Sequence, residues 1–419
     1  MKILYLSSDL GIPVLGQKGA SVHLRGLVTA FVRAGHSVVL AAPLLNKSPW
    51  EGPAKLDVSL LHLPPSADTV NAVLALKSFN EMLGVANPLP GELRRILYNQ
   101  EVVTQLKRRF EHDPPDFIYE RASLYGTAAV TLSRELNVPL VVELNAPLAV
   151  EQSAYRATGL GELAAQAERW ALLQADAVLT VSVPLRDYVV SLGVEPGRLY
   201  VIPNGVDPAL FQPGPPDPRA RARWGLGNGP VLGFVGGLRP WHGVEALPTL
   251  LERLVHRYRG LRLVIVGDGP LRGELERTLK ERRLTGSVVI TGWLPHEEVA
   301  ELIQQFDVGL APYSKPEHAF YFSPLKLFEY MSCGIPVVAA ALGQIAEIVR
   351  DGETGLLYPP GDVDALIGAC DRLLAEPALR QRLGQAAVKE VHGLYTWDQN
   401  AVRVVELARS RIAARGAGR

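Results

Sequence analysis

Short apolar runs alternate with amphipathic stretches along the chain. Residues 2–7 are mostly apolar, residues 22–34 carry apolar side chains at helical spacing, and residues 36–42 are apolar again. Brief apolar runs separated by helices are typical of buried parallel strands. A loop that contains Gly19 joins the first run to the helix. This strand–loop–helix–strand unit predicts a doubly wound α/β domain.

The same alternation continues to about residue 207 and then starts again. Residues 208–218 are rich in proline and glycine, which is typical of a domain boundary. A chain of 419 residues suits two domains, so we predict one over 1–207 and a second over 208–397. The further predicted strands are 60–63, 116–121, 140–145, 177–181, 199–202, 231–235, 263–266, 288–290, 308–311, 335–341 and 355–358.

Two long helices are predicted in the first domain, over 92–110 and 154–173. The first of them carries many cations: Arg94, Arg95, Lys107, Arg108 and Arg109. Such a helix can bind a membrane surface or an anionic acceptor, and it can also be a plain solvated face, which is the commoner case.

The segment from residue 321 to residue 341 reads as a loop, a helix and a strand. Pro324 suits the first turn of a helix, and residues 325–332 have helical apolar spacing. The N-terminus of a helix has free N–H groups and partial positive charge, so it suits an anion such as phosphate. Lys326 opposes the helix dipole there, and its position is better explained if the lysine meets an anionic ligand.

Glu329 follows Lys326 by three residues and therefore shares a helix face with it. Its carboxylate can accept hydrogen bonds from sugar or ribose hydroxyls. The alternative is an exposed ion pair with Lys326, worth only a few tenths of a kcal/mol.

Polar residues end two neighbouring strands of the first domain: Glu120 and Arg121 end one, and Glu143 and Asn145 end the other. Ligands of open α/β sheets bind at the carboxyl ends of strands. These four residues are therefore candidates for the acceptor or sugar side of a cleft, although each can instead be a structural hydrogen-bonding residue.

Three strand-to-helix turns of the second domain carry further candidates. Arg239 can grip phosphate oxygens in a bidentate way, and His242 can bind phosphate and be protonated beside it. Gly269 lies in the GDGP turn, and Trp293 offers a stacking face. The alternatives are that His242 packs its own loop and that Trp293 packs in the core.

Charge and cysteine content narrow the class of protein. There are 43 basic and 43 acidic residues, so the formal net charge is zero, which argues against a nucleic-acid binder that depends on overall positive charge. The two cysteines give no disulfide framework, and no metal-ligand spacing is present. We see no signal peptide or bilayer-spanning run, so we expect a cytoplasmic protein, with peripheral contact at the inner face of the membrane as an alternative.

The segment SPLKLFEYMSCGIPVVA, from Ser323 to Ala339, resembles the nucleotide-sugar-binding signature of the family 4 retaining glycosyltransferases. GQKGASVH at 16–23 and PNGVD at 203–207 resemble two further segments of this family. The resemblance implies a GT-B fold, in which two Rossmann-like doubly wound domains face a cleft and a C-terminal helix, here 398–419, returns to the first domain. It also implies that the first domain binds the acceptor and the second domain binds the nucleotide sugar.

The resemblance assigns roles to residues that match the family pattern and to Arg239 and His242, which are available as replacements for two of its cations. Lys326, Arg239 and Glu329 are expected in catalysis, without a metal ion or cofactor. The residues expected to bind the donor are Gly19, Arg239, His242, Gly269, Trp293, Leu294, Ser323, Pro324, Leu325, Lys326 and Glu329.

The chain departs from the family pattern at several positions. The family has an arginine at the position of Gly237 and a lysine at that of His242. Its first glutamate, which meets the donor sugar, is replaced by Tyr321, and Glu317 lies too early to substitute for it. The histidine that many members carry just after the strand at 140–145 is absent.

The resemblance predicts a hexosyl or related transferase that moves a sugar from a UDP- or GDP-sugar to an acceptor hydroxyl with retention of configuration. The acceptor is expected on a glycan, a lipid-linked molecule or a small molecule. Two alternatives remain: a non-catalytic sugar-nucleotide sensor or scaffold, and an NAD-dependent oxidoreductase, for which the GDGP turn is the sole support. GT-B epimerases and phosphorylases share the fold but match the central segment less well.

Overall fold

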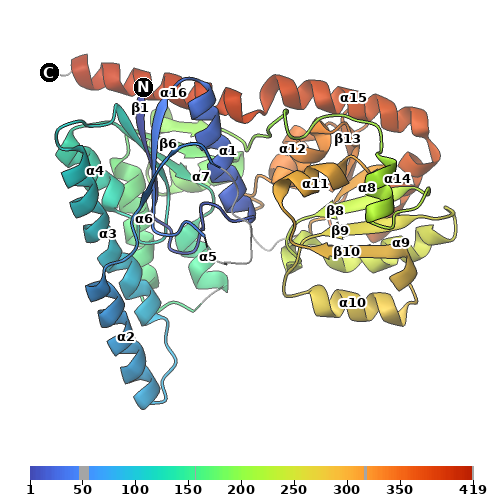
Figure 1. Cartoon of the computed structure of the whole chain (residues 1–419), viewed down its shortest axis with the longest axis horizontal. Coiled ribbons are helices and arrows are strands. Elements are labelled where there is room, and N and C mark those ends of the chain that lie inside the picture. Colours follow the sequence, from blue (N-terminus) through green and yellow to red (C-terminus); the bar gives the residue numbers. More distant parts are fainter. Residues whose placement is uncertain (47–55, 156, 316–318, 418–419) are drawn as a thin grey trace. The chain divides into compact units, whose positions relative to one another are not determined.

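The computed structural model describes residues 1–46, 56–155, 157–315 and 319–417. The chain divides into two compact units: unit 1 contains residues 1–203 and 398–419, and unit 2 contains residues 204–397. Each unit is a parallel sheet with helices packed against it (Figure 1). This is the arrangement that the alternating apolar pattern predicts.

The sheet of unit 1 has seven strands in the order β3-β2-β1-β4-β5-β6-β7, and every pair of neighbours is parallel. The chain builds outward from β1 in one direction and from β4 in the other, so the strand order reverses between these two strands. The carboxyl ends of strands at such a reversal are the usual ligand site of an open α/β sheet. The strands are β1 (Lys2–Ser7), β2 (Ser37–Ala42), β3 (Ser59–His62), β4 (Phe117–Arg121), β5 (Leu140–Leu144), β6 (Ala177–Thr180) and β7 (Leu199–Val201).

The C-terminal helix packs on unit 1, as the resemblance predicted. Its side chains form ion pairs along its length, from Asp398 to Arg33 and from Arg415 to Asp176. The helices of unit 1 are α1 (Gly19–Arg33), α2 (Ala67–Met82), α3 (Leu89–Phe110), α4 (Ala128–Leu136), α5 (Leu148–Tyr155), α6 (Gly161–Gln174), α7 (Val183–Ser191) and α16 (Trp397–Ala417), with a 3-10 turn η1 (Pro196–Arg198).

Two helical predictions for unit 1 were incomplete. The expected single helix over 154–173 is two helices, α5 and α6, because the backbone of Gly159 between them donates a hydrogen bond to the buried carboxylate of Glu92 on α3. The helix α2 was not predicted, since few of its side chains are buried and it lacks the apolar stripe that indicates an amphipathic helix.

The sheet of unit 2 has six parallel strands in the order β10-β9-β8-β11-β12-β13. They are β8 (Val231–Val235), β9 (Arg262–Val266), β10 (Val288–Gly292), β11 (Val308–Ala311), β12 (Val337–Ala340) and β13 (Gly355–Tyr358). The helices are α8 (Pro218–Arg223), α9 (Leu247–Val255), α10 (Arg272–Glu281), α11 (His296–Ile303), α12 (Leu325–Ser332), α13 (Gly343–Ile348), α14 (Val363–Ala375) and α15 (Pro377–Leu394), with 3-10 turns η2 (Pro240–His242), η3 (Val244–Ala246) and η4 (Thr285–Ser287).

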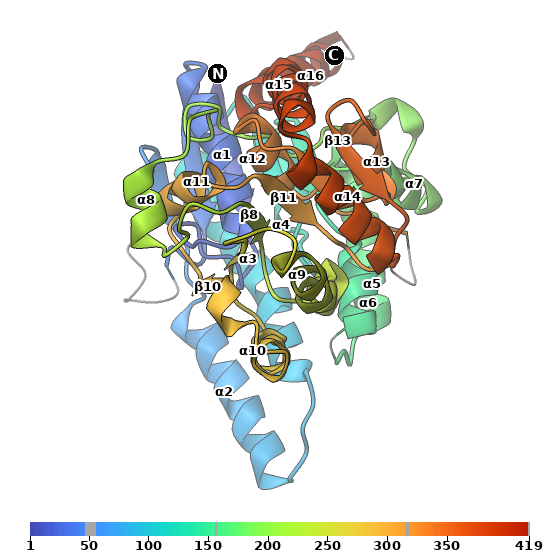
Figure 2. The same cartoon turned by 90° about the vertical axis from the view of Figure 1, so that its right-hand side faces the viewer.

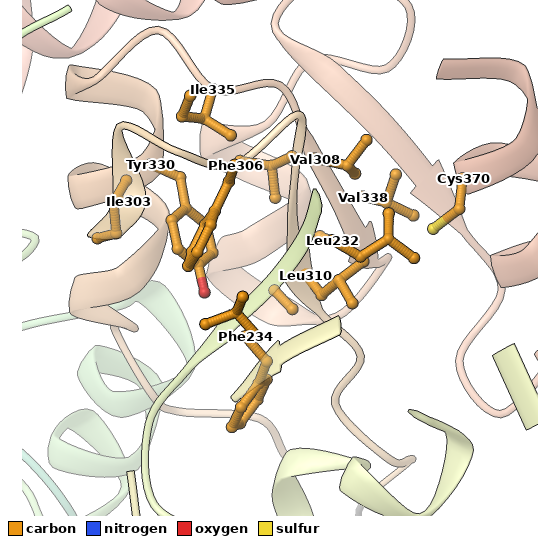
Figure 3. Packing of buried hydrophobic residues seen from close by; sticks show 14 of the residues in the cluster. Leu232, Phe234, Ile303, Phe306, Val308, Leu310, Tyr330, Ile335, Val338 and Cys370 are labelled. Atoms are coloured by element: carbon orange, nitrogen blue, oxygen red, sulfur yellow. The ribbon is translucent and has the colours of Figure 1, made fainter. Parts of the chain in front are cut away.

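Aromatic side chains pack directly on the sheet of unit 2. Phe306 and Tyr330 lie edge to face with ring centroids 6.2 Å apart, over β8 and β11 (Figure 3). A Cβ atom on Gly233 would lie 2.0 Å from the ring of Phe306, and one on Gly309 would lie 2.6 Å from the ring of Tyr330. Gly309 therefore allows Tyr330, and with it the helix α12 that carries Lys326, to approach the sheet closely. Gly233 does the same for Phe306, which precedes β11.

Candidate functional site

Lys326 is a buried cation in the first turn of α12. Its side chain is 6% exposed, and Nζ lies 4.2 Å from the ring centroid of Phe234 and 5.0 Å from that of Tyr313. Among the described residues, Nζ has no hydrogen-bond partner. Two aromatic faces stabilise an ammonium group only in part. A buried lysine with unused N–H donors at a helix N-terminus is suited to bind an anion.

Burial lowers the pKa of Lys326 to about 7, and the carboxylate of Glu329 opposes this shift. The lysine is therefore poised to take up a proton when an anion arrives, because a neighbouring negative charge stabilises the ammonium form.

Glu329 is held by a residue that the sequence analysis did not single out. Its Oε1 lies 2.9 Å from Nε2 of His296, the first residue of α11. The His296 ring packs edge to face with Phe211, and the two ring centroids are 4.8 Å apart. The alternative of an exposed ion pair between Lys326 and Glu329 is wrong: both side chains are buried, and no such pair forms among the described residues. The contact joins two helices far apart in sequence, so only the fold reveals it.

The loop after β8 passes directly over Lys326. Gly236 has a φ of +143°, and a Cβ atom there would lie 2.8 Å from Nζ of Lys326. The backbone of this loop can approach the ammonium group because residue 236 has no side chain.

Two predicted donor residues extend from this loop. Nδ1 of His242 donates a hydrogen bond to the carbonyl of Gly237, and burial together with Lys326 lowers the pKa of His242 to about 3. Without an anion beside it, the imidazole is therefore neutral at pH 7. Arg239 is exposed, with its guanidinium 5.8 Å from the ring centroid of Trp241.

The GDGP turn packs against the same loop. The nitrogen of Leu238 donates to the carbonyl of Asp268, and a Cβ atom on Gly269 would lie 2.4 Å from the carbonyl oxygen of Leu238. The structure thus gives Gly269 a packing role, which is to allow the two turns to lie side by side.

Trp293 follows β10 and is 46% exposed, so the alternative that it packs in the core is wrong. An aromatic face this accessible is available for stacking. The next residue, Leu294, is half-buried against the core of unit 2. Leu294 therefore anchors this segment to the core, while the ring of Trp293 beside it faces solvent.

Ser323, Pro324 and Leu325 form the entry to α12. Ser323 Oγ accepts a hydrogen bond of 3.0 Å from the backbone nitrogen of Asn204, and Nδ2 of Asn204 donates to the carbonyl of Ser323 at 2.6 Å. Pro324 is the residue before the first helical residue, Leu325. The side chain of Ser323 is thus engaged structurally, which fixes the orientation of the helix N-terminus.

Tyr321, at the position of the first family glutamate, is a buried aromatic residue. It is 5% exposed and its ring centroid lies 4.5 Å from that of Phe322. Glu317, the other glutamate considered, lies outside the described residues.

A cavity of about 470 Å³ adjoins the same region of unit 2. Its lining includes Pro240, Gly243 and Ser314, but neither Lys326 nor Glu329 nor Trp293. The cavity is therefore separate from the candidate donor site around the buried ammonium group of Lys326.

In unit 1, Glu143 at the end of β5 pairs with His23 of α1. Oε1 of Glu143 lies 3.0 Å from Nε2 of His23, and both side chains are buried. Burial alone would raise the pKa of Glu143, but His23, Arg121 and Asn145 lower it below its ordinary value. The structure therefore gathers three of the four predicted strand-end residues around one buried carboxylate.

Glu120 is separated from this group by the sheet itself. Arg121 is in register with Glu143, whereas Glu120 is in register with Val142. Because side chains alternate between the faces of a strand, Glu120 lies on the opposite face. Burial raises its pKa to about 8, so it is mostly a neutral acid at pH 7.

Several buried polar atoms on β1 and β4, on the same face of the sheet as Glu143, have no hydrogen-bond partner among the described residues. Among the described residues they include the hydroxyls of Tyr5 and Ser7 and Nε of Arg121. Buried polar groups are usually paired, so a cluster of unpaired ones is suited to a polar ligand. The sequence analysis gave no role to His23, which it placed in a helix, or to Tyr5, which lies inside an apolar run.

Gly19 is the first residue of α1, at the end of the loop after β1. The loop is fixed from the helix: Ser21 Oγ donates to the carbonyl of Pro13 at 2.6 Å, and Arg25 Nη1 donates to the carbonyl of Val14 at 2.8 Å. The N-terminus of α1 is therefore held in place one turn before His23.

The described residues contain neither a cluster of metal ligands nor a helix that could cross a membrane. Within them, no group of three or more His, Cys, Asp or Glu side chains could hold a metal ion. No described helix combines the length and the apolar character needed to cross a bilayer.

Comparison with known proteins identifies the class. The family model described as Glycosyltransferase Family 4 matches residues 17–210, and the model described as Glycosyl transferases group 1 matches residues 229–376. A D-inositol 3-phosphate glycosyltransferase of Acidothermus cellulolyticus is 30% identical over 359 residues, which are 80% of this chain and 77% of that protein. The chain belongs to glycosyltransferase family 4.

Two more relatives match over nearly their whole length. A glycogen synthase of Mycobacterium tuberculosis is 26% identical over 97% of this chain and 94% of its own. The solved structure of sucrose-phosphate synthase from Thermosynechococcus elongatus covers 99% of this chain and 100% of its own, with a TM-score of 0.74 and 23% identity, which shows the GT-B fold. The protein is a retaining glycosyltransferase that uses a nucleotide-sugar donor.

Proposed function

We propose that unit 2 binds a UDP- or GDP-sugar and that Lys326 holds its diphosphate. The observation that carries this proposal is the buried ammonium group of Lys326, which lacks a hydrogen-bond partner among the described residues at the N-terminus of α12. The backbone N–H groups in the first turn of α12, which begins at Leu325, add to the attraction for phosphate.

The remaining donor contacts follow from the positions of the other side chains. Arg239 is exposed and free to close on the diphosphate. The neutral His242 fixes the Gly237 carbonyl and so supports the loop over Lys326. Glu329, oriented by His296, accepts hydrogen bonds from the ribose hydroxyls, and the exposed face of Trp293 stacks on the base beside Leu294.

In the transfer step, the bond from the anomeric carbon to the diphosphate breaks and a bond to the acceptor oxygen forms on the same face. The acceptor proton passes to the leaving phosphate oxygen, so the step needs no protein base. Lys326 and Arg239 stabilise the negative charge that develops on the leaving diphosphate.

We propose that unit 1 binds the acceptor through the group around Glu143, with Arg121 and Asn145 beside it. The acceptor presents a hydroxyl of a glycan, a lipid-linked molecule or a small molecule. Support comes from the unpaired buried polar atoms of Tyr5 and Ser7 near this carboxylate. Glu120 lies on the other face and has a structural role in this proposal.

The first experiment tests the purified chain against a panel of nucleotide sugars, by thermal shift and by release of nucleoside diphosphate. We expect one donor to stabilise the fold and to release diphosphate slowly. The variant Lys326→Met should abolish both effects, while Lys280→Met, which changes an exposed lysine of α10, should abolish neither. Wild-type turnover by Lys326→Met would rule out the proposed role of this lysine.

A further inference from the structure

A narrow crevice opens in unit 1 at the carboxyl ends of β1 and β4. Its polar lining comes from Ser8, Asp9, Arg95, Asn99 and Ser123. The strand order of the sheet reverses between β1 and β4, and ligands of open α/β sheets bind at such a reversal. The helix α3 forms one wall of the crevice, whereas the group around Glu143 meets α1, and the two share no residue. The crevice is therefore a second polar site at the same end of the sheet.

Ser8 supplies a polar atom that the protein itself leaves unused. The residue is 7% exposed, and its Oγ atom is buried without a hydrogen-bond partner among the described residues. A buried hydroxyl group without a partner costs free energy, and nearly all buried polar groups in proteins are paired. Because Ser8 lines the crevice, the group that occupies the crevice is the natural partner of this hydroxyl.

The wall on α3 holds a cation at the crevice. The helices α2 and α3 form a hairpin whose turn extends away from the sheet (Figures 1 and 2). Farther along α3, the hydroxyl of Tyr98 donates to the carbonyl of Leu63, just after β3, and so joins the helix to the sheet. About one turn earlier, Nη1 of Arg95 donates to the carbonyl of Gly91 at 3.1 Å. A guanidinium group has five N–H donors, so Arg95 keeps donors for a ligand.

Another wall is the loop after β4, which hydrogen bonds from α3 hold in place. Nδ2 of Asn99 donates to the carbonyl of Tyr125 at 2.9 Å, and Oδ1 of Asn99 accepts from the backbone nitrogen of Thr127 at 2.7 Å. The hydroxyl of Tyr125 donates to the buried carboxylate of Glu92 at 2.9 Å. Tyr125 has a φ of +63°, which is uncommon for a residue other than glycine, and these bonds hold it there. The crevice is therefore formed before a ligand arrives.

Size and charge select the group that the crevice accepts. Its volume is about 10 Å³, which is close to the space that one water molecule or one hydroxyl group needs. Arg95 contributes a positive charge and Asp9 a negative one, so the polar lining has no net charge. A phosphate or a carboxylate would lie beside Asp9, and an ammonium group would lie beside Arg95. A neutral hydroxyl group suits both, because it accepts a hydrogen bond from a guanidinium and donates one to a carboxylate.

We propose that the crevice binds one hydroxyl group of the acceptor, and that the acceptor is a polyol such as a sugar or a cyclitol. Arg95 donates to this hydroxyl group, Asp9 accepts from it, and Ser8 gains the partner that it lacks. Another hydroxyl group of the same molecule then receives the transferred sugar, so the acceptor carries at least two. The inference rests on the proposed binding of the acceptor by unit 1 and adds the chemical class of that acceptor.

The first test measures the binding of polyols to the full chain without donor, by saturation-transfer difference NMR. The probes are myo-inositol, methyl α-glucoside and methyl α-mannoside, with inorganic phosphate as a competitor. The test variants are Ser8→Ala and Arg95→Met. The control is Arg94→Met, which changes the neighbouring arginine of α3, a residue outside the lining of the crevice.

We expect at least one probe to bind the wild type and Arg94→Met. Its dissociation constant should rise about fivefold or more in each test variant, because each variant removes a hydrogen bond to the ligand. The melting temperature of Ser8→Ala should not fall, since this variant removes an unpaired buried hydroxyl. A wild type that binds none of the three polyols would overturn the proposal, because the crevice then holds only a water molecule. Polyol binding that is unchanged in the test variants, or that phosphate abolishes, would also overturn it.

The second test uses the donor that the nucleotide-sugar panel identifies. The polyol that binds should speed the release of nucleoside diphosphate by the wild type and by Arg94→Met. At a polyol concentration below the dissociation constant, this increase should be about fivefold smaller in Ser8→Ala and Arg95→Met. A polyol that binds without any effect on release would overturn the acceptor role of the crevice. A chain that binds a polyol through the crevice but no donor would overturn the proposed function and not the polyol site.

Discussion

Nε2 of His23, one turn into α1, lies 3.0 Å from Oε1 of Glu143 at the carboxyl end of β5. The pair is buried and joins the first helix of the chain to a strand more than a hundred residues later. Many family members carry a histidine just after this strand, and this chain has none there. Here a histidine reaches the strand end from α1.

The first prediction concerns this pair. His23→Ala removes the hydrogen-bonded partner of the buried Glu143 carboxylate and leaves Arg121 and Asn145 beside it, so we expect a loss of about 1–3 kcal/mol in the free energy of unfolding at pH 7, measured with urea. The wild-type Glu143 has a lowered pKa, and the stability it contributes is present above its unfolded pKa and lost as pH falls through the lowered value. The difference between variant and wild type should therefore shrink in acid. A difference in unfolding free energy between variant and wild type that is as large in acid as at pH 7 would contradict this account.

The second prediction separates stability from activity at Lys326. Replacing a buried ammonium group by a neutral chain of similar length removes its desolvation cost. We therefore expect Lys326→Met to raise the free energy of unfolding, measured with urea, by about 1–3 kcal/mol. The same variant should lose about 100-fold or more in kcat, because the charge that develops on the leaving group is no longer stabilised. Lys280→Met serves as the control for both measurements. A variant that loses both stability and activity would indicate a structural lysine.

The third prediction concerns pH. With its pKa lowered to about 7, Lys326 is largely neutral in the free protein above that pH, and donor binding must then restore the proton. The dissociation constant for the donor should rise by up to about tenfold for each pH unit above neutrality, up to the ordinary lysine pKa.

Calorimetry in buffers of different ionisation enthalpy should show that protons are taken up as the donor binds at pH 8 (about one unit above the lowered pKa). A dissociation constant that does not change between about pH 6 and pH 9 would show that Lys326 stays charged throughout.

The fourth prediction tests His296 as a positioning residue. His296→Ala frees Glu329 from its 2.9 Å hydrogen bond, and we expect the KM for donor to rise about tenfold, since a hydrogen bond to a charged group contributes about 1.5 kcal/mol or more. The kcat should change much less, because His296 does not meet the leaving group. The control is His256→Ala at an exposed position. A nucleoside that lacks the ribose hydroxyls should bind the wild type and His296→Ala equally. A difference between their affinities for this nucleoside would argue for a structural role of His296.

The sequence by itself determined the fold class and the bounds of the helix that carries Lys326. Apolar runs of strand length, alternating with amphipathic helices, leave few arrangements other than parallel sheets covered by helices. The helix at 325–332 has the same bounds in the structure as in the prediction, since Pro324 starts it and Gly334 follows its end. These features depend on local sequence, so each strand, helix and helix end can be predicted from its own segment of the chain.

Only the tertiary structure decided which distant side chains meet. His23 and His296 look like ordinary helix residues in the sequence. Each meets a buried carboxylate, at 3.0 Å and 2.9 Å, only because the fold brings a strand or another helix beside it. The register of β4 and β5 separated Glu120 from Arg121, because adjacent residues of a strand face opposite sides. The exposure of α2 could not be predicted either: burial is a property of the packed chain, and the same apolar residues would be core if another element covered them.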